Sequence, residues 1–188
     1  MLKLNAKELR RRKPGKNELR GLKRNQIYLI LDNVLDTYNI GGLFRLADAI
    51  GAQKVILCGE TETPPSSRIH KAAVGTEEWV GWQYAESAAS AIAKLKATLR
   101  KETHASKKLK VIAVEQSEKS IPFSRLSLSL PPNTPVALVV GHETQGVSKN
   151  VLKMADLVVE IPMFGVNKSL NVIVSAAIVL YKILETNS

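Results

Sequence analysis

Two loops in the C-terminal third of the chain carry the residue types best suited to chemistry. The first, G-H-E-T-Q-G, places Glu143 between Gly141 and Gly146, and glycine lets a backbone approach a ligand closely. The second, P-M-F-G-V-N-K-S-L-N, contains Ser169 and Asn171. A carboxylate, a hydroxyl and an amide brought together would form a polar ligand site. The plainer interpretation is a solvated glutamate in a turn, with Ser169 as a helix N-cap and Asn171 in the first helical turn.

Apolar segments on either side of these loops must position them. Residues 136–140 and 157–161 are predicted strands, and each ends in one of the two loops. Ligands of open α/β sheets bind at the carboxyl ends of strands, so we expect both loops at one edge of a sheet. The second loop leads into a predicted helix over residues 170–181, which is apolar on all sides except at Asn171 and Ser175. We expect the sheet to cover one side of this helix and a second copy of the chain to cover the other.

The N-terminal half shows the same strand–loop–helix arrangement. A predicted strand at residues 27–31 leads to a helix at 40–50, whose apolar residues recur at the spacing of a core face. Gly41 and Gly42 in its first turn each cost about 1 kcal/mol relative to alanine, which predicts close approach of a ligand or another chain. Arg45 stands one turn beyond Gly41. It either faces that ligand or forms a surface pair with Asp48.

Strands alternate with helices along the rest of the chain. Residues 54–58, 79–84 and 111–114 are predicted strands, residues 88–101 a helix and residues 117–135 a loop. This pattern predicts one α/β domain, with a mostly parallel sheet and helices on both faces. The single cysteine, Cys58, excludes an internal disulfide, and no apolar run is long enough to span a membrane. We therefore expect a cytoplasmic location and no membrane partner.

The positive charge is concentrated at the N-terminus. The chain carries a net charge of +10, and residues 1–25 hold ten basic side chains against two acidic ones. Such a basic arm indicates a nucleic acid partner, although a solvated tail is the simpler alternative. Aromatic residues are absent from the arm, so phosphate contacts are expected rather than base stacking. The predicted RNA-binding residues are Arg10, Arg11, Arg12, Lys13 and Lys16 of the arm, together with Arg68 and Lys71 of a second basic segment.

Three sequence strings together resemble the motifs of the SpoU (TrmH-type) RNA 2′-O-ribose methyltransferase family of the SPOUT superfamily. They are N-I-G-G-L-F-R, V-V-G-H-E-T-Q-G-V-S and I-P-M-F-G-V-N-K-S-L-N-V, in the order of the family. Thr37 stands where the family often has proline. The resemblance covers residues 27–184 and omits the arm, which divides the chain into an arm at 1–25 and a methyltransferase domain at 26–188. It implies a C-terminal trefoil knot, S-adenosyl-L-methionine as cofactor, a homodimer formed through the C-terminal helix, and no metal.

The resemblance also implies roles for individual residues. Its catalytic positions are Asn39, Arg45, Glu143, Ser169 and Asn171, and its cofactor positions are Gly141, Ile161, Met163 and Leu170. A guanidinium does not lose its proton near neutral pH, so Arg45 is expected to stabilise the charge that develops on a ribose 2′-oxygen. The group that accepts the proton of the 2′-hydroxyl is left unassigned.

The expected activity is 2′-O-methylation of a ribose in structured RNA, with tRNA favoured over rRNA. Two alternatives remain: an RNA-binding module of the same fold without catalysis, and a methyltransferase that acts on a tRNA base.

Overall fold

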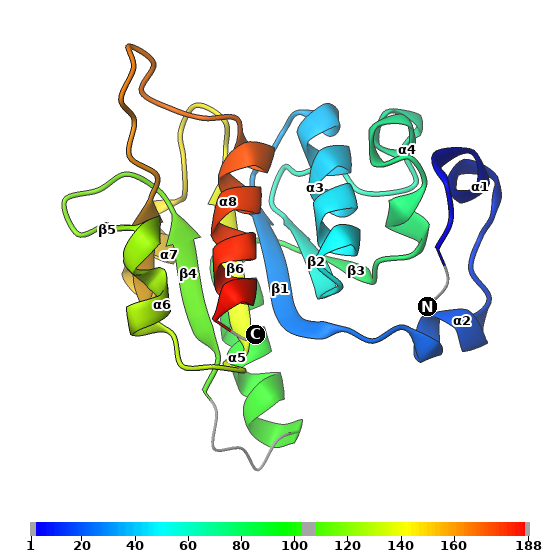
Figure 1. Cartoon of the computed structure of the whole chain (residues 1–188), viewed down its shortest axis with the longest axis horizontal. Coiled ribbons are helices and arrows are strands. Elements are labelled where there is room, and N and C mark those ends of the chain that lie inside the picture. Colours follow the sequence, from blue (N-terminus) through cyan, green and yellow to red (C-terminus); the bar gives the residue numbers. More distant parts are fainter. Residues whose placement is uncertain (1–2, 103–107, 187–188) are drawn as a thin grey trace.

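The chain folds around one parallel sheet with helices on both faces (Figure 1). The computed structural model describes residues 3–102 and 108–186. Seven strands follow the order β3-β2-β1-β6-β4-β7-β5, and each strand pairs in parallel with its neighbours. The predicted α/β fold class is confirmed for this part of the chain. The trefoil knot stays a prediction.

The elements alternate along the chain. The strands are β1 (Asn25–Asp32), β2 (Ala52–Cys58), β3 (Trp82–Ala85), β4 (Lys110–Val114), β5 (Ile121–Pro122), β6 (Val136–Gly141) and β7 (Leu157–Glu160). The α-helices are α1 (Ala6–Arg11), α2 (Lys16–Gly21), α3 (Thr37–Ala49), α4 (Ser67–Ala73), α5 (Ala88–Glu102), α6 (Leu126–Ser129), α7 (Lys149–Met154) and α8 (Val172–Glu185). Two 3₁₀ turns, η1 (Thr76–Glu78) and η2 (Phe123–Arg125), complete the set.

Two apolar layers hold the helices against the sheet. Successive side chains of a strand point to opposite faces, so a fully apolar strand contributes to both layers. In β1, Leu29 and Leu31 belong to the layer under α3 and α8, whereas Tyr28 and Ile30 belong to the layer under α5 and α7. Cys58 lies in the second layer, where burial and the nearby Asp32 carboxylate raise the pKa of its thiol to about 12. Cys58 is therefore a core residue, as expected.

The glycines of α3 allow close packing inside the chain rather than contact with a ligand. A Cβ on Gly41 would lie 2.5 Å from the Cβ of Ala72 in α4, and a Cβ on Gly42 would lie 2.3 Å from Cδ1 of Ile173 in α8. A close approach is present, but the expectation that a ligand or another chain makes it is wrong, because the approaching groups are two helices of the same chain.

Several boundaries differ from those predicted. The last helix runs from Val172 to Glu185 rather than over 170–181, and residues 117–135 contain β5, η2 and α6 instead of one loop. The strand predicted at 79–84 is the shorter β3, because Trp79 follows the 3₁₀ turn η1 and is buried there. Trp82 and Tyr84 of β3 are exposed, since this strand lies at the edge of the sheet.

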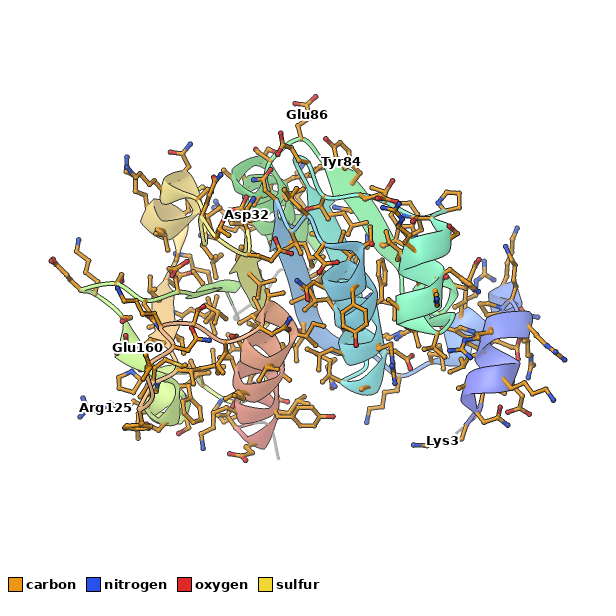
Figure 2. The ribbon with its side chains drawn as sticks, turned by 90° about the horizontal axis from the view of Figure 1, so that it is seen from above. Lys3, Asp32, Tyr84, Glu86, Arg125 and Glu160 are labelled. Carbon is orange, nitrogen blue, oxygen red and sulfur yellow. The ribbon has the colours of Figure 1, made fainter. Side chains whose placement is uncertain are left out.

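The basic arm is folded. It forms α1 and α2. In the first turn of each helix a glutamate, Glu8 or Glu18, accepts a hydrogen bond from the backbone N–H of the N-cap residue, Asn5 or Gly15. The arm packs beyond β3 beside α4, at one end of the long axis of the molecule (Figure 1). Figure 2 shows Lys3 of the arm at that end and Glu160 of β7 toward the other.

Candidate active site

A cavity of about 280 Å³ opens at the carboxyl ends of β4, β6 and β7. This edge is where open α/β sheets bind ligands. The cavity brings together all four residues of the predicted cofactor set, Gly141, Ile161, Met163 and Leu170. Glu143 and Ser169 also line it, so the two C-terminal loops meet as the sequence predicted.

Glu143 is bonded to the start of α3, far away in the sequence. Its carboxylate accepts hydrogen bonds from the backbone N–H groups of Leu35 (3.2 Å) and Asp36 (3.1 Å) and from Nδ2 of Asn39 (2.9 Å). Partial burial acts to raise the pKa of Glu143, but the Asn39 side chain and the backbone donors outweigh it and leave the pKa below its usual value. The Glu143 side chain is thus a fixed anion that ties the first loop to α3.

Asn39 links this anion to the second loop. While its Nδ2 donates to Glu143, its Oδ1 accepts from Nδ2 of Asn171 at 2.9 Å. Asn39 is only 4% exposed, and a buried amide requires partners for both of its ends. Glu143, Asn39 and Asn171 therefore form one hydrogen-bonded chain that joins the three motif segments.

Asn171, rather than Ser169, caps the last helix. Its Oδ1 accepts from the backbone N–H of Ile173 at 2.8 Å. Ser169 lies two residues before this cap, is exposed and borders the cavity, so the predicted capping role of Ser169 is wrong. Its hydroxyl is free for another contact, because among the described residues only its backbone N–H, bonded to Asn167, has a partner.

Arg45 lies on the outer face of α3, away from the core. It is exposed and does not line the cavity. Within the described residues its side chain has no hydrogen bond or ion pair, so the alternative surface pair with Asp48 is not formed. Burial raises the pKa of Asp48, and the nearest opposing charges are those of Arg24 and Lys3. Arg45 is therefore available to a group from outside the chain.

Sequence reasoning missed Glu115 and Gln116, which also line the cavity. Glu115 Oε2 accepts from the backbone N–H of Val147 at 2.8 Å, and Gln116 Nε2 donates to the carbonyl of Lys168 at 2.7 Å. These contacts hold both cavity loops against the end of β4. Their position directly after an apolar strand was the available signal, since the same signal identified Glu143.

The predicted RNA-binding residues are all on the surface, but they are not equivalent. Arg10, Arg11, Lys16, Arg68 and Lys71 are exposed and have no side-chain partner within the described residues. By contrast, the remaining two predicted cations are paired inside the chain: Arg12 with Glu18, and Lys13 with Glu78.

His70, which lies in the second basic segment, is partly exposed and is paired within the chain. Its Nδ1 pairs with Oε1 of Glu77, a carboxylate that is only 7% exposed.

Metal sites and membrane spans are two further features that a sequence of this kind could carry. Over residues 3–102 and 108–186, no group of three or more histidine, cysteine, aspartate or glutamate side chains could hold a metal ion. No helix in this described part is both long and apolar enough to cross a bilayer.

Comparison with known proteins identifies relatives of the whole described fold. Residues 26–181 match the model of the SpoU rRNA Methylase family. A 23S rRNA (guanosine-2′-O-)-methyltransferase RlmB of Nitrosomonas europaea is 32% identical over 96% of this chain and 64% of its own length. The tRNA (guanosine(18)-2′-O)-methyltransferase of Escherichia coli is 26% identical over 88% of this chain and 66% of its own length. The chain thus spans less than two thirds of the length of these curated relatives.

A solved structure agrees with these matches. The AdoMet-bound rRNA methyltransferase from Sinorhizobium meliloti superposes with a TM-score of 0.74 at 26% identity, covering 94% of this chain and 59% of that one. Together with the three joined motif segments, the match over residues 26–181 establishes that the chain belongs to the SpoU methylase family.

Proposed function

We propose that this protein is an S-adenosyl-L-methionine-dependent methyltransferase that acts on a ribose 2′-hydroxyl of structured RNA. The observation that carries the proposal is the hydrogen-bonded chain from Glu143 through Asn39 to Asn171. It ties all three family motifs together at the edge of one cavity, which Glu143 lines, and a chain without catalysis has no need of that arrangement. The named methylation substrates of the relatives, 23S rRNA and tRNA, support RNA as the substrate class.

The cavity suits the cofactor in both size and chemistry. Its volume of about 280 Å³ is near the lower end of the range of roughly 300–1,000 Å³ typical of small-molecule pockets. The lining carries Glu115, Glu160 and Lys168, which match a ligand that bears two cationic groups and one carboxylate. Ile161, Met163 and Leu170 offer apolar surface for an adenine ring. Bound there, the cofactor supplies an electrophilic methyl group.

The residues of the chain would position the ribose and stabilise its charge. The 2′-oxygen loses its proton to an acceptor that is still to be identified, forms a bond to the methyl carbon, and the bond from that carbon to sulfur breaks. Ser169, at the rim of the cavity with an unpaired hydroxyl, can bind the ribose or a phosphate. Arg45 would neutralise the oxyanion or an adjacent phosphate with its planar donor fork.

A homodimer through α8 accounts for the place of Arg45. Within one chain Arg45 does not reach the cavity, but α3 packs directly against α8 through Gly42 and Ile173. The outward face of α8 is apolar and exposed, with Val174 at 45% and Tyr181 at 52%. A second copy that covers this face would also approach the outer face of α3. We therefore propose that the active form is a dimer.

We propose that the substrate is tRNA rather than rRNA, and one methylation assay tests both the substrate and the reaction. Purified protein is incubated with labelled S-adenosyl-L-methionine and with tRNA or rRNA from a strain that lacks the gene. The RNA is then digested to nucleosides. We expect the label on a 2′-O-methyl nucleoside. A labelled base would instead support the base methyltransferase. If no label is incorporated, the RNA-binding module without catalysis is supported.

Arg45 variants test the mechanism in the same assay. Arg45→Ala should lower single-turnover methylation by about 100-fold or more, which is typical for loss of one charge-stabilising donor, and leave cofactor affinity unchanged. Arg45→Lys should recover little, because the planar fork is lost. Arg125→Ala, which removes another exposed arginine outside the cavity, is the matched control. Near-normal turnover by Arg45→Ala would remove Arg45 from the mechanism.

A further inference from the structure

The basic arm is fixed to the body of the protein at one short segment. Residues 75–79, which we call the docking platform, lie under α1 and α2. Gly75 has a φ of +90°, and a Cβ at this position would lie 2.3 Å from the carbonyl oxygen of Leu9 in α1. The guanidinium of Arg12 lies 5.9 Å from the centre of the Trp79 ring, within the range of a cation–π contact. Arg24 donates to the Trp79 carbonyl.

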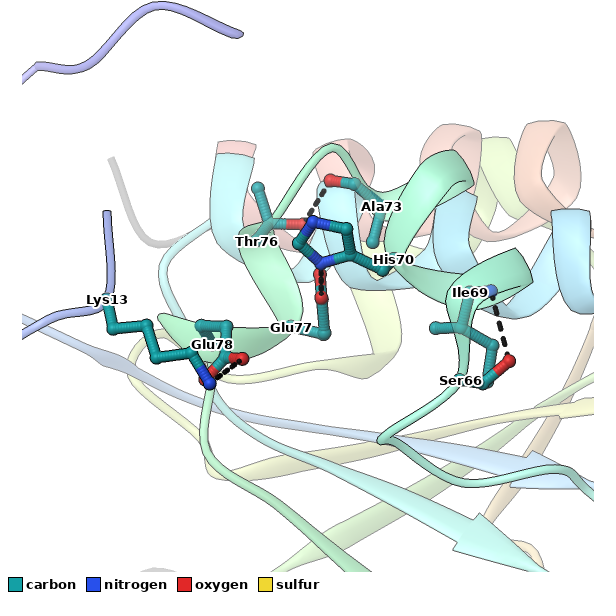
Figure 3. Close-up of polar contacts among 8 residues, drawn as sticks. All are labelled: Lys13, Ser66, Ile69, His70, Ala73, Thr76, Glu77 and Glu78. Atoms are coloured by element: carbon teal, nitrogen blue, oxygen red, sulfur yellow. Dashed lines mark hydrogen bonds and ion pairs between the residues drawn. The ribbon is translucent and has the colours of Figure 1, made fainter. Parts of the chain in front are cut away.

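The docking platform is itself fixed by contacts with α4. Figure 3 shows Lys13 of the arm reaching Glu78, at 3.1 Å, while the neighbouring Glu77 pairs with His70 of α4. The hydroxyl of Thr76 donates to the carbonyl of Ala73 at 2.8 Å, which fixes the platform to the end of α4. The arm therefore has one defined orientation on the sheet domain.

Docking divides eight of the ten cations of the arm into two sets. The inward set, Arg12, Lys13 and Arg24, is used in contacts with the platform or within the arm. The outward set is exposed and, within the described residues, its side chains make no hydrogen bond or ion pair; it comprises Lys7, Arg10, Arg11, Lys16 and Arg20. Charge alone could not separate the two sets, because their members are interspersed along the sequence.

A groove beside α1 concentrates part of the outward charge. It has a volume of about 560 Å³ and is lined by Leu4, Lys7, Glu8, Arg11, Arg12 and Lys13. Its only acidic side chain, Glu8, accepts from the backbone N–H of Asn5 at 2.8 Å and so serves as a helix cap. The cations on the wall without a partner among the described residues are Lys7 and Arg11, and both are exposed.

We propose that the docked arm is a preorganised phosphate-binding element, in which the outward set binds the phosphodiester backbone of the substrate RNA and the inward set only holds the arm in place. This inference rests on the proposed RNA substrate and assigns the cations that contact it. A fixed arm avoids the entropy loss that a disordered tail would undergo on binding. The arm and the cavity lie toward opposite ends of the long axis, so a bound RNA must be folded and large enough to extend from one to the other (Figure 2).

Adjacent arginines provide a matched test. Arg11→Gln and Arg12→Gln remove the same charge one residue apart. Binding of a fluorescent, unmodified tRNA transcript is measured without cofactor at several salt concentrations. Arg11→Gln should reduce the slope of log affinity against log salt by about 0.7–0.9, the value of one phosphate contact, and keep the arm resistant to trypsin. Arg12→Gln should leave the slope within the error of the wild type and make the arm sensitive to trypsin.

Two further tests use a triple charge removal in the outward set and a substitution that undocks the arm without changing its charge. Lys7→Gln/Arg10→Gln/Arg11→Gln should lower tRNA affinity at least tenfold, whereas Lys94→Gln/Arg100→Gln/Lys101→Gln on α5 should change it less than twofold. Gly75→Ala keeps every cation but should undock the arm, which increases acrylamide quenching of Trp79 fluorescence in a Trp82→Phe background. Gly81→Ala is its control, because a Cβ at this position would meet only the backbone carbonyl oxygen of Gln53, at 3.7 Å.

Three outcomes would overturn the inference. They are equal losses of tRNA affinity in the two triple variants, equal salt slopes and trypsin sensitivity for Arg11→Gln and Arg12→Gln, and arm-dependent binding to phosphatidylserine vesicles without binding to tRNA. Because binding is measured without cofactor, the result does not depend on methyl transfer. A protein that binds tRNA through the outward set but never methylates it would contradict the proposed function alone.

Discussion

At the scale of single residues, Glu143 shows how a carboxylate beside a cavity can serve as a structural anion. Three N–H donors converge on it from the segment before and inside the start of α3. Such donors stabilise the ionised form, and this outweighs the effect of partial burial on the pKa. Glu143 is therefore a poor candidate for the proton acceptor of the reaction, because its conjugate acid is less stable than that of an ordinary glutamate.

The lowered pKa of Glu143 predicts a pH-dependent contribution to stability. A folded-state pKa below the unfolded value of about 4.3 means that the contribution is fully present above that pH and is lost as the pH falls through the folded pKa. At pH 7, Glu143→Gln should lower the free energy of unfolding by about 1 kcal/mol, a figure that already allows for the solvent exposure of the side chain. This loss corresponds to a decrease in Tm of about 2–4 °C. Once the pH is below the folded-state pKa of Glu143, the two Tm values should converge.

The control is Glu118→Gln, which alters an exposed glutamate without a side-chain partner in the described residues. Its Tm should follow the wild type at every pH. A constant difference between wild type and Glu143→Gln across the acid range would show that the three hydrogen bonds do not depend on ionisation.

At the scale of elements, α8 combines three tasks. Asn171 begins the helix and also binds Asn39, so the helix start is part of the site. The inward face packs Ala176, Val179 and Leu180 into the core. The outward face, which includes Val174 and Tyr181, is apolar but uncovered in the single chain. A sheet can cover only one side of such a helix, which favours a second copy on the other.

A charge on the outward face of α8 should prevent dimer formation. Ile178 lies between Val174 and Tyr181 on this face, and Ile178→Lys would place an ammonium group in an apolar interface. We expect light scattering to give a dimer for the wild type and a folded monomer for the variant, with at least a hundredfold loss of methylation. Ala93→Lys on the exposed face of α5 should stay dimeric and active. A monomeric wild type with full activity would contradict the proposed dimer.

At the scale of the whole molecule, the arm and the cavity are separate parts of the structure. The cavity lies among β4, β6, β7 and the loop before α8, whereas the arm contacts the docking platform next to α4. None of the described arm residues, 3–25, lines the cavity. Cofactor binding and arm-dependent RNA binding should therefore be separable.

Removal of residues 1–24 should leave cofactor affinity unchanged. Calorimetry with S-adenosyl-L-methionine is expected to give the same Kd, within twofold, for the full chain and the shortened one. Far-UV circular dichroism and Tm check that the sheet domain remains folded after Trp79 loses Arg12. A shortened chain that is folded but no longer binds the cofactor would show that the two parts are coupled.

The sequence by itself determined most of the strands, the long helices and the motif segments, because the signals for these are local. Continuous apolar runs marked β1, β2, β4 and β6, and polar residues after β6 and β7 marked the two loops that line the cavity. The alternation of strands and helices was sufficient for a parallel sheet. The four residues that the family resemblance assigns to the cofactor all line this cavity, and their role in cofactor binding stays a prediction.

Only the tertiary structure decided which partners these residues have. Glu143 binds backbone groups 107 and 108 residues earlier in the chain, and Asn171 rather than Ser169 caps α8 because Asn39 holds it there. The two sets of arm cations are interspersed along the sequence, so only docking on the platform separates Arg11 from Arg12. Contacts of this kind depend on how distant elements pack, and the residue types in a local pattern do not specify them.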